Sequence, residues 1–497
     1  MSLDLSPDPL PGDPAPAHPP PSPPSLALSS PAGRTALFAT TVGAALGLVD
    51  MGLVNVALAS LGRGLQTSFS ALQWLLCAQL VPMAALLLFG GSLGERLGRR
   101  KIFTLGLLFL LAGSGLASWA PQFRILLAGR ALQGLGAALL LPTSYALLRA
   151  SFSGFERART IALWSGLCAL LTLGAPLAGG ALAAQSWRWV FLFNLPLGLL
   201  ALVCSRALPE SRDRSSPAPD YLGALTGLLA LGGLIYAAIE GPARGWDVPP
   251  VLFGAAVGLA ATALFVRLQI GRPKAMVPMA LFGSAIFTGA SLITFLTHFA
   301  LMGGLFLLTL QLQLRLDFSP VQAGAALLPT GLLTLLLSPP VGRWLRSAGH
   351  RLLIGSGGLL IALSFLLLRR VLPGAAYPQM ILPALLLLGI GLAMVMGPLS
   401  SAILKSAGGA ESLGRGAALG NAVAQCASVS AVALLPWLGG HGSPAESFGQ
   451  AMKICAGFAA GGALCAWFTL GALDRRRKTA PPRHARRAWV GSQALRR

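Results

Sequence analysis

Two charged side chains lie deep inside long apolar stretches of the sequence. Asp50 is the only acid in such a position, and Arg130 is the only base. A charge at the middle of a bilayer costs roughly 2.5–3.5 kcal/mol even on insertion scales, so it is retained for a pathway, a proton site or an ion pair. We expect the two residues to pair inside a helical bundle, and protonation of Asp50 to release Arg130. A static structural ion pair is the alternative.

Polar neighbours of this pair are candidates for the lining of a cavity. Gln133 lies three residues after Arg130 and therefore shares its helix face. Asn55 lies five residues after Asp50, about 140° round an ideal helix. Both therefore face one cavity only if Gly52 lets the helix bend.

Further polar residues are scattered through the apolar stretches. His298 is expected to be a structural histidine, with a second protonation site or a substrate contact as the alternative. Asn421 and Gln425 share a helix face at a spacing of four residues, and they either line a substrate cavity or bond neighbouring helices. The full set of substrate-cavity candidates is Asn55, Gln133, Asn194, Glu240, His298, Gln311, Asn421 and Gln425.

The elements that carry these residues are expected to be membrane-spanning helices. Of the 497 residues, 10% are charged and 55% are hydrophobic, and the mean hydropathy is +0.72. A soluble domain has about 25% charged residues. Lipid offers the backbone no hydrogen-bond partner, so apolar stretches of ~20 residues must be helical. We predict an all-α integral membrane protein with fourteen transmembrane helices, at residues 36–59, 72–93, 102–120, 124–148, 160–184, 190–208, 221–240, 251–270, 283–311, 322–344, 352–371, 379–404, 415–438 and 450–473.

The basic residues predict how these helices are oriented. With the amino terminus inside the cell, 28 of the 37 Lys and Arg residues fall in inside segments and eight in outside segments. This bias follows the positive-inside rule and predicts a multi-pass protein of the cell membrane with both termini in the cytoplasm. The net charge of +22 does not indicate a nucleic-acid partner, since no soluble domain is expected to carry a binding face.

The cysteines and the loops give no sign of an enzyme. All six cysteines lie in apolar stretches and form no C-x-x-C pair, so we expect neither a disulfide framework nor a metal site. The loops are short and lack clustered catalytic groups. The sequence contains no G-x-x-x-x-G-K-[ST] loop to bind a nucleotide, and we expect no cofactor.

A ten-residue segment occurs twice with the same glycine spacing. Gly-Ser-Leu-Gly-Glu-Arg-Leu-Gly-Arg-Arg at 91–100 follows the second predicted helix, and Gly-Arg-Trp-Leu-Arg-Ser-Ala-Gly-His-Arg at 342–351 follows the tenth. In the second copy Arg346 stands where the acid would be. The glycines permit a tight turn, and the charges predict a gating latch at the membrane surface. This gating loop consists of Gly91, Glu95, Arg96, Gly98, Arg99 and Arg100.

The first copy resembles a loop of the major facilitator superfamily, which reads G-x-L-x-D-R-x-G-R-R, with Glu95 in place of the Asp. Arg130–Gly136 looks like R-x-x-Q-G-x-G of the same superfamily.

Three segments are similar to motifs of the fourteen-helix drug:proton antiporter family. They are Leu48–Leu58 (L-D-x-T-V-V-N-V-A-L, with Gly52 for the Thr), Ala175–Gly180 (G-P-x-x-G-G, with Ala for the first Gly) and Trp187–Gly198 (W-R-W-I-F-x-I-N-V-P-I-G).

The resemblance implies a major facilitator fold of two six-helix bundles plus two inserted helices. Pro176 would bend its helix because it lacks an amide hydrogen, and Gly179 and Gly180 would permit close packing, which together make an antiporter hinge. The implied domains are a disordered Pro-rich cytoplasmic tail at 1–33, a six-helix bundle at 34–210, a linker with two inserted helices at 211–275, a second six-helix bundle at 276–473 and a basic cytoplasmic tail at 474–497.

The implied function is a proton-coupled antiporter that exports hydrophobic or amphipathic small molecules, such as antibiotics, by alternating access. Its partners would be a small-molecule substrate, protons and the lipid bilayer, and we expect a monomer. An importer, a lipid flippase or a specific metabolite exporter is the alternative within the superfamily. A non-transporting sensor or receptor is the alternative from another class, and it would need an added soluble domain or a long ligand loop.

Overall fold

The computed structural model describes residues 26–213, 216–272, 275–406, 410–440, 443–471 and 473–474. These residues form helices and no strand, as the apolar stretches predict. The predicted tails at 1–33 and 474–497 lie mostly outside the described residues, and residues 31–33 belong to the first helix. The helices are α1 (Pro31–Leu65), α2 (Phe69–Leu97), α3 (Arg99–Ser118), α4 (Phe123–Ser151), α5 (Gly154–Gln185), α6 (Trp187–Leu192), α7 (Asn194–Ser205), α8 (Tyr221–Arg244), α9 (Pro249–Gln269), η1 (Met279–Gly283), α10 (Ala285–Leu314), α11 (Pro320–Leu368), η2 (Tyr377–Ile381), α12 (Leu382–Ser406), α13 (Ala410–Leu438) and α14 (Pro444–Thr469).

Thirteen helices in this part of the chain are long and apolar enough to cross a membrane. One of them, α11, has 49 residues and contains both predicted helices 322–344 and 352–371. Gly349 lies between the two with φ 83° and ψ 170°, outside the helical region. The chain reverses direction there. The Tyr377 hydroxyl, which follows the second leg, donates to the Ala326 carbonyl near the start of the first leg at 3.0 Å, so the two legs lie side by side. The thirteen spans therefore correspond to the fourteen predicted helices.

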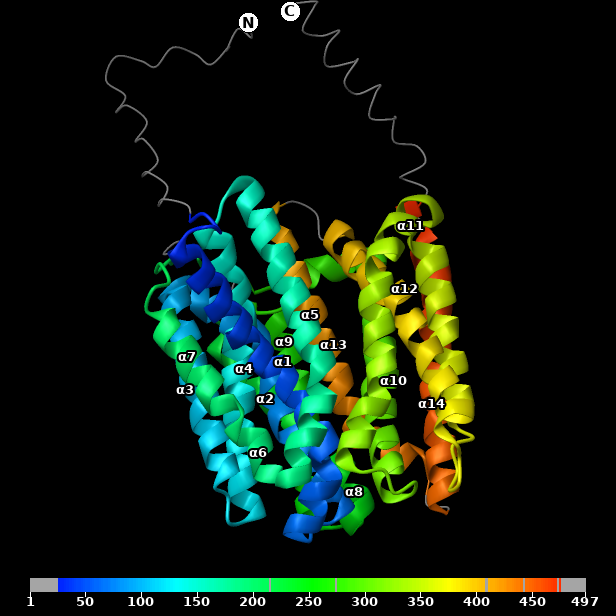
Figure 1. The fold of residues 1–497 in the computed structure, drawn as a ribbon. Coiled ribbons are helices and arrows are strands. Elements are labelled where there is room, and N and C mark those ends of the chain that lie inside the picture. Colours follow the sequence, from blue (N-terminus) through cyan, green and yellow to red (C-terminus); the bar gives the residue numbers. More distant parts are fainter. Residues whose placement is uncertain are drawn as a thin grey trace, which may run out of the picture.

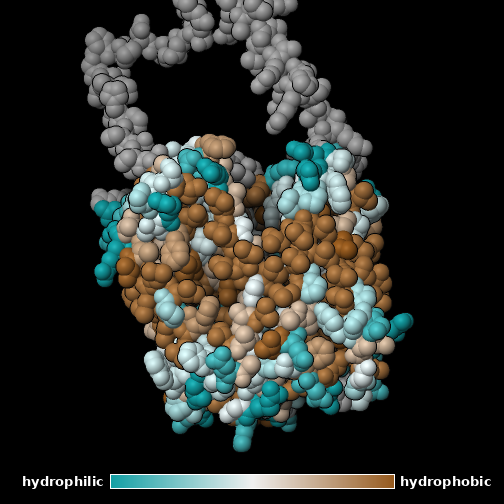
Figure 2. All heavy atoms as spheres, in the orientation of Figure 1, coloured by the Kyte–Doolittle hydropathy of each residue, from teal (hydrophilic) through white to brown (hydrophobic). Residues whose placement is uncertain are grey.

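The beginning of α1 and the end of α14 lie at the same end of the bundle (Figure 1). We call this the terminal end and the opposite one the distal end. A broad apolar belt crosses the visible face of the molecule between more polar ends (Figure 2). Large apolar side chains such as Phe253 and Phe468 are more than two-thirds exposed, at 71% and 79%. Such a surface is stable in lipid rather than in water.

The apolar interior consists of several clusters. One is formed almost entirely by α10–α14, which we call the second half. A smaller cluster joins α1, α3, α4 and α7 of the first half, α1–α7. A third cluster combines α1 and α2 with α8, α10 and α13. The two halves thus have interiors of their own and share a third.

The two halves meet along three seams near the distal end, between α1 and α10, α2 and α13, and α5 and α11. At the terminal end the surface is hollowed between two lobes (Figure 2). This structure is therefore closed at its distal end and open at its terminal end. Close contacts across the seams join Asn55 to Thr309, Gln73 to Val432, Gly180 to Pro320 and Gly324 to Pro176.

The inserted helices α8 and α9 form a hairpin on the surface of the bundle. α8 packs against α2 and α13, and α9 packs against α8. Gly233 and Gly258 allow the two hairpin helices to approach closely, since a Cβ at Gly258 would lie 2.6 Å from the Leu234 amide nitrogen. The hairpin lies outside both halves and touches each of them through α8.

We predict that the connection at Gly349 lies on the same side of the membrane as the termini. Arg346 and Arg351 flank it, and basic residues favour the cytoplasmic side. Reporter fusions that end at Leu208 and Gly349 should both report the cytoplasm, and a control fusion that ends at Arg370 should report the outside. An outside signal at Gly349 would contradict the division of α11 into two spans.

Candidate functional site

Asp50 of α1 and Arg130 of α4 meet inside the first half. Their side chains are shut off from solvent, at 1% and 0% exposed. Arg130 Nη1 donates to Asp50 Oδ2, so the two charges form the ion pair that the sequence predicts. The ring of Phe191 lies 5.8 Å from the guanidinium carbon and covers the pair on one side.

The second oxygen of the Asp50 carboxylate is bound by two amides. Asn194 Nδ2, at the start of α7, donates to Asp50 Oδ1 at 2.8 Å, and Gln133 Nε2 of α4 donates to it at 3.3 Å. Ser114 of α3 accepts from Gln133 Nε2 at 2.8 Å and from Asn194 at 3.4 Å. The carboxylate therefore joins α1 to α4 and α7, with α3 behind them.

The Arg130 guanidinium has a second set of partners that does not include Asp50. Its Nε donates to the Leu75 carbonyl at 2.9 Å, and its Nη2 donates to Gln79 Oε1, both on α2. Its Nη1 also reaches Gln133 Oε1 at 2.8 Å on its own helix. Because the guanidinium is planar with fixed donor directions, these bonds hold it in place independently of the acid.

The two charged groups are therefore held unequally. Protonation of Asp50 would remove the attraction that ties α1 to Arg130, whereas Arg130 would keep its acceptors on α2 and α4. A proton at this site would loosen α1 and leave the base in position.

Sequence analysis selects Gln133 and Asn194 as cavity candidates, and the structure brings both to Asp50. It does not select Gln79 or Ser114. The signal that selects Gln133, an amide inside an apolar stretch, applies equally to Gln79. Ser114 carries no such signal, because hydroxyls in helices commonly bond to carbonyls of their own helix.

The hinge motif of α5 lies at the distal seams rather than beside Asp50. A Cβ at Gly179 would lie 2.6 Å from the Leu53 carbonyl oxygen of α1, so only glycine allows this approach. Gly180 faces the Pro320 carbonyl of α11 in the same way, and Pro176 lies against Gly324. The motif thus seals α5 against α1 and α11 at the distal end.

Asn55 and Gln311 also lie away from the ion pair. Asn55 Nδ2 donates to Thr309 Oγ1 at 3.2 Å across the α1–α10 seam. Gln311 Nε2 donates to the Val371 carbonyl at 3.1 Å within the second half. Each amide therefore bonds a neighbouring segment.

The other polar candidates are spread through the bundle. Asn421 is exposed and Gln425 is half-buried on α13, and neither side chain has a hydrogen-bond partner within the described residues. His298 is half-buried on α10, with Nδ1 2.9 Å from the Thr294 carbonyl. Glu240 lies at the distal end of α8, where it binds Trp74.

The gating loop contacts the linker that follows α7. Gly98 has a φ of 120°, and a Cβ there would lie 2.8 Å from the Glu210 carboxylate. Glu210 Oε1 accepts from the Arg100 amide at 3.1 Å, and Arg96 Nη1 donates to the Ser216 carbonyl at 2.6 Å. Glu95 is exposed, and its carboxylate forms no ion pair with any residue that the structure describes.

At the second copy of this loop, Asp474 takes the place that Glu210 has at the first copy. Asp474, after α14, accepts from the amides of His350 at 2.9 Å and Arg351 at 3.1 Å, next to Gly349. Partial burial raises the pKa of Asp474, but these amides and the His350 ring outweigh it and hold the pKa below its usual range. In the first half, Glu210 after α7 accepts from an amide at the start of α3. In the second half, Asp474 after α14 accepts from amides at the start of the second leg of α11.

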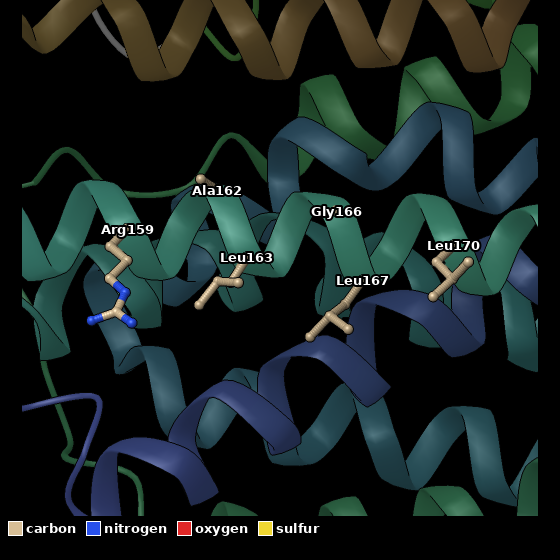
Figure 3. A pocket seen from close by; sticks show the side chains of 6 residues that line it. All are labelled: Arg159, Ala162, Leu163, Gly166, Leu167 and Leu170. Atoms are coloured by element: carbon tan, nitrogen blue, oxygen red, sulfur yellow. The ribbon is translucent and has the colours of Figure 1, made fainter. Parts of the chain in front are cut away.

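The terminal half of α5 carries a shallow apolar recess (Figure 3). Arg159 lies at one end of it, and Leu163, Leu167 and Leu170 follow along the helix. These leucines are 40–53% exposed. Leu173, one turn further along α5, lies against Gly331 of α11. The recess therefore lies next to a contact between α5 and α11.

An apolar bundle of this kind, with a buried ion pair and a closed and an open end, is typical of multi-pass membrane transporters. Residues 40–432 match the sequence pattern of the Major Facilitator Superfamily, and the chain belongs to this family. Membership of this family indicates a transporter rather than an enzyme.

Several curated relatives are drug-resistance proteins by name. The Methylenomycin A resistance protein of Bacillus subtilis (strain 168) is 35% identical over 303 residues, which cover 61% of this chain and 65% of the relative, slightly under two thirds of its length. The Puromycin resistance protein pur8 of Streptomyces alboniger is 32% identical over 394 residues, 78% of each chain. The Multidrug resistance protein Stp of Mycobacterium tuberculosis (strain ATCC 25618 / H37Rv) is 32% identical over 371 residues, 73% of this chain and 68% of the relative.

Solved transporters share the fold at low sequence identity. The inward open xylose transporter XylE from E. coli has a TM-score of 0.60 at 15% identity and covers 87% of this chain and 95% of its own. A peptide transporter POT in complex with sulfate has a TM-score of 0.65 at 17% identity, with 91% and 97% covered. These likenesses establish the fold.

We predict that Gln79→Ala destabilises the protein. The change would leave Arg130 Nη2 buried without an acceptor, which costs about 1–3 kcal/mol. The melting temperature of the purified protein in detergent should fall clearly. Gln185→Ala, at the exposed distal end of α5, is the matched control and should melt like the unaltered protein. Equal melting of the two variants would show that Gln79 does not support Arg130.

Proposed function

We propose that the protein is a proton-coupled antiporter that exports hydrophobic or amphipathic small molecules across the cell membrane. The observation that carries the proposal is the buried Asp50, which accepts hydrogen bonds from Arg130, Gln133 and Asn194. A lone acid kept in this position, at the cost of burying its charge, is suited to alternate between a proton and a fixed base. The names of the drug-resistance relatives agree with export.

The coupling follows from the unequal hold on the two charges. With Asp50 ionised, the carboxylate ties α1 to α4 and α7 and favours one packing of the first half. When a proton neutralises Asp50, α1 loses its ionic bond to Arg130. The substrate and the proton therefore bind to different states of the protein. The two halves then rock about the central site, which opens the terminal and distal ends in turn.

The geometry also supports the proposed placement in the membrane. We place the terminal end in the cytoplasm, with both termini inside, and the distal end outside. The first half at 34–210 and the second half at 276–473 act as the two bundles of a monomer. Pro176, Gly179 and Gly180 seal the distal end in the state seen here, and the gating loop at 91–100 changes its partners between states.

The available charges favour particular substrates. Polyvalent cations would need several buried acids to offset their desolvation. The described helices bury two acids, Asp50 and Glu240, and Glu240 lies at a helix end. Anions would favour Arg130, but Asp50 already engages it. An apolar lining with Asn421, Gln425 and His298 as scattered polar contacts favours lipophilic substrates with one positive charge or none.

We predict that Asp50→Asn reduces proton-driven accumulation in inverted vesicles more than tenfold while the protein still inserts. Insertion is eased because the burial cost of the charge disappears. Substrate exchange without a proton gradient should survive, since the amide of Asn can still bond Gln133 and Asn194. Strong accumulation by this variant would rule out Asp50 as the proton site.

The matched control for this prediction is Asp247→Asn, which removes an exposed acid from the α8–α9 connection. It should transport at the rate of the unaltered protein. Equal losses in both variants would point to a general effect of charge on the assay.

We predict that inverted vesicles accumulate lipophilic monovalent cations and neutral amphiphiles in preference to divalent cations and organic anions. A protonophore should abolish this accumulation, because it removes the driving force. Preferential uptake of the anions, or ATP-dependent uptake after the proton gradient has collapsed, would contradict the proposal. Uptake of phospholipid or of a single metabolite alone would instead identify a flippase or a specific exporter, and uptake in the opposite direction an importer.

A further inference from the structure

Gln73 of α2 fills a gap in the hydrogen bonding of α13. Pro436 lacks an amide hydrogen, so the carbonyl of Val432 one turn earlier has no helical donor. Gln73 Nε2 donates to the Val432 carbonyl at 2.8 Å and to the Ala433 carbonyl at 3.1 Å. The Gln73 side chain is 5% exposed. Since a freed carbonyl inside a membrane protein needs a partner, this amide fixes α2 against α13.

The next residue of α2 binds the inserted hairpin. Trp74 Nε1 donates to Glu240 Oε1 of α8 at 2.7 Å. The other oxygen of Glu240 accepts from Arg244 Nε at 2.6 Å, one helical turn further on. Glu240 is 6% exposed, and Arg244 neutralises its charge. Glu240 therefore anchors α8 to α2.

The residues just after α8 contact α13 next to Pro436. The rings of Trp246 and Trp437 lie 5.6 Å apart at 64°, an edge-to-face contact. Trp246 is held in place by Gly241, because a Cβ there would lie 2.7 Å from the indole ring. Such aromatic pairs are favourable beyond the apolar area that they bury.

We propose that these contacts form a clamp that holds the distal α2–α13 seam closed, with the inserted hairpin as its third side. Gln73 joins α2 to α13, Glu240 joins α8 to α2, and Trp246 joins α8 to α13. The clamp rests on the proposed alternating access, in which this seam has to part. Glu240 is then a positioning residue that acts through α8, and it does not contact substrate.

The clamp divides unequally when the seam opens. The bond that joins α8 to α2 is charge-assisted, since Trp74 Nε1 donates to the Glu240 carboxylate, which also pairs with Arg244 of its own helix. The contact of the hairpin with α13 is the ring contact of Trp246 with Trp437, which is weaker than a charge-assisted hydrogen bond. We therefore expect the hairpin to stay with the first half when the seam opens, while Gln73 and Trp246 lose their contacts with α13.

Cys77 provides a reporter inside the same seam. It follows Gln73 by one turn of α2, is fully buried, and its Sγ lies 3.9 Å from the Val429 carbonyl of α13. A thiol reagent reaches it only when the seam opens. With the other five cysteines replaced by alanine, the rate of alkylation by a small maleimide added from the distal side measures that opening.

Gln73→Ala should raise the rate of Cys77 alkylation roughly three- to tenfold, as expected for the loss of a buried hydrogen bond. Glu240→Leu and Trp246→Ala should each raise it about twofold or more, since either change detaches one side of the clamp. Gln185→Ala and Asp247→Asn are matched distal controls and should leave the rate unchanged. If Gln73→Ala does not fold, Gln73→Asn, whose amide is one methylene too short, replaces it with the same expectation.

Unchanged alkylation in the Gln73 and Glu240 variants would overturn the clamp. So would a Glu240→Leu protein that loses transport of cationic substrates with normal Cys77 alkylation, because Glu240 would then be a substrate residue. The readout does not depend on proton coupling, so failure of the Asp50 prediction leaves it valid. If Cys77 of the reporter protein without further changes never reacts, even during transport, the proposed alternating access fails rather than the clamp.

Discussion

The burial of one carboxylate constrains the whole first half of the bundle. Asp50 has no access to water, so its charge and its lone pairs have to be satisfied by other helices. Arg130 neutralises it, Gln133 and Asn194 fill the second oxygen, and α2 supplies acceptors that hold Arg130. Helices α1, α2, α4 and α7 are thereby fixed around one point. Any change in the charge of this carboxylate alters the packing of all of them.

The distal end is closed by a different kind of interaction. Glycines bring backbones of α1, α5 and α11 into direct contact, and amides of Gln73 and Asn55 bond across the seams. These glycine and amide contacts contain no charged group, so they do not depend directly on a proton. The Asp50 site and the seal are separated along the helices, so in the proposed coupling rigid helices carry the response from one to the other.

The terminal end shows a repeated device in which an acid from beyond the sixth helix caps a loop glycine. Glu210 does this at Gly98 and Asp474 at Gly349. Each acid satisfies free amides at the start of the following helix, where negative charge is favoured. This explains how the second loop keeps its turn although Arg346 replaces the acid within it.

The sequence by itself determined the class of fold, the helices and the pairing of Asp50 with Arg130. The bilayer sets the length of every span, and the cost of a buried charge leaves each of these residues only one suitable partner. The tertiary structure alone decided that Gln79 and Ser114 join this site, that Asn55 lies at a seam, and that Glu240 anchors α8. These contacts depend on how each helix is rotated and tilted against its neighbours. Hydropathy records only that a residue lies in a helix, since lipid and a neighbouring helix are equally apolar surroundings.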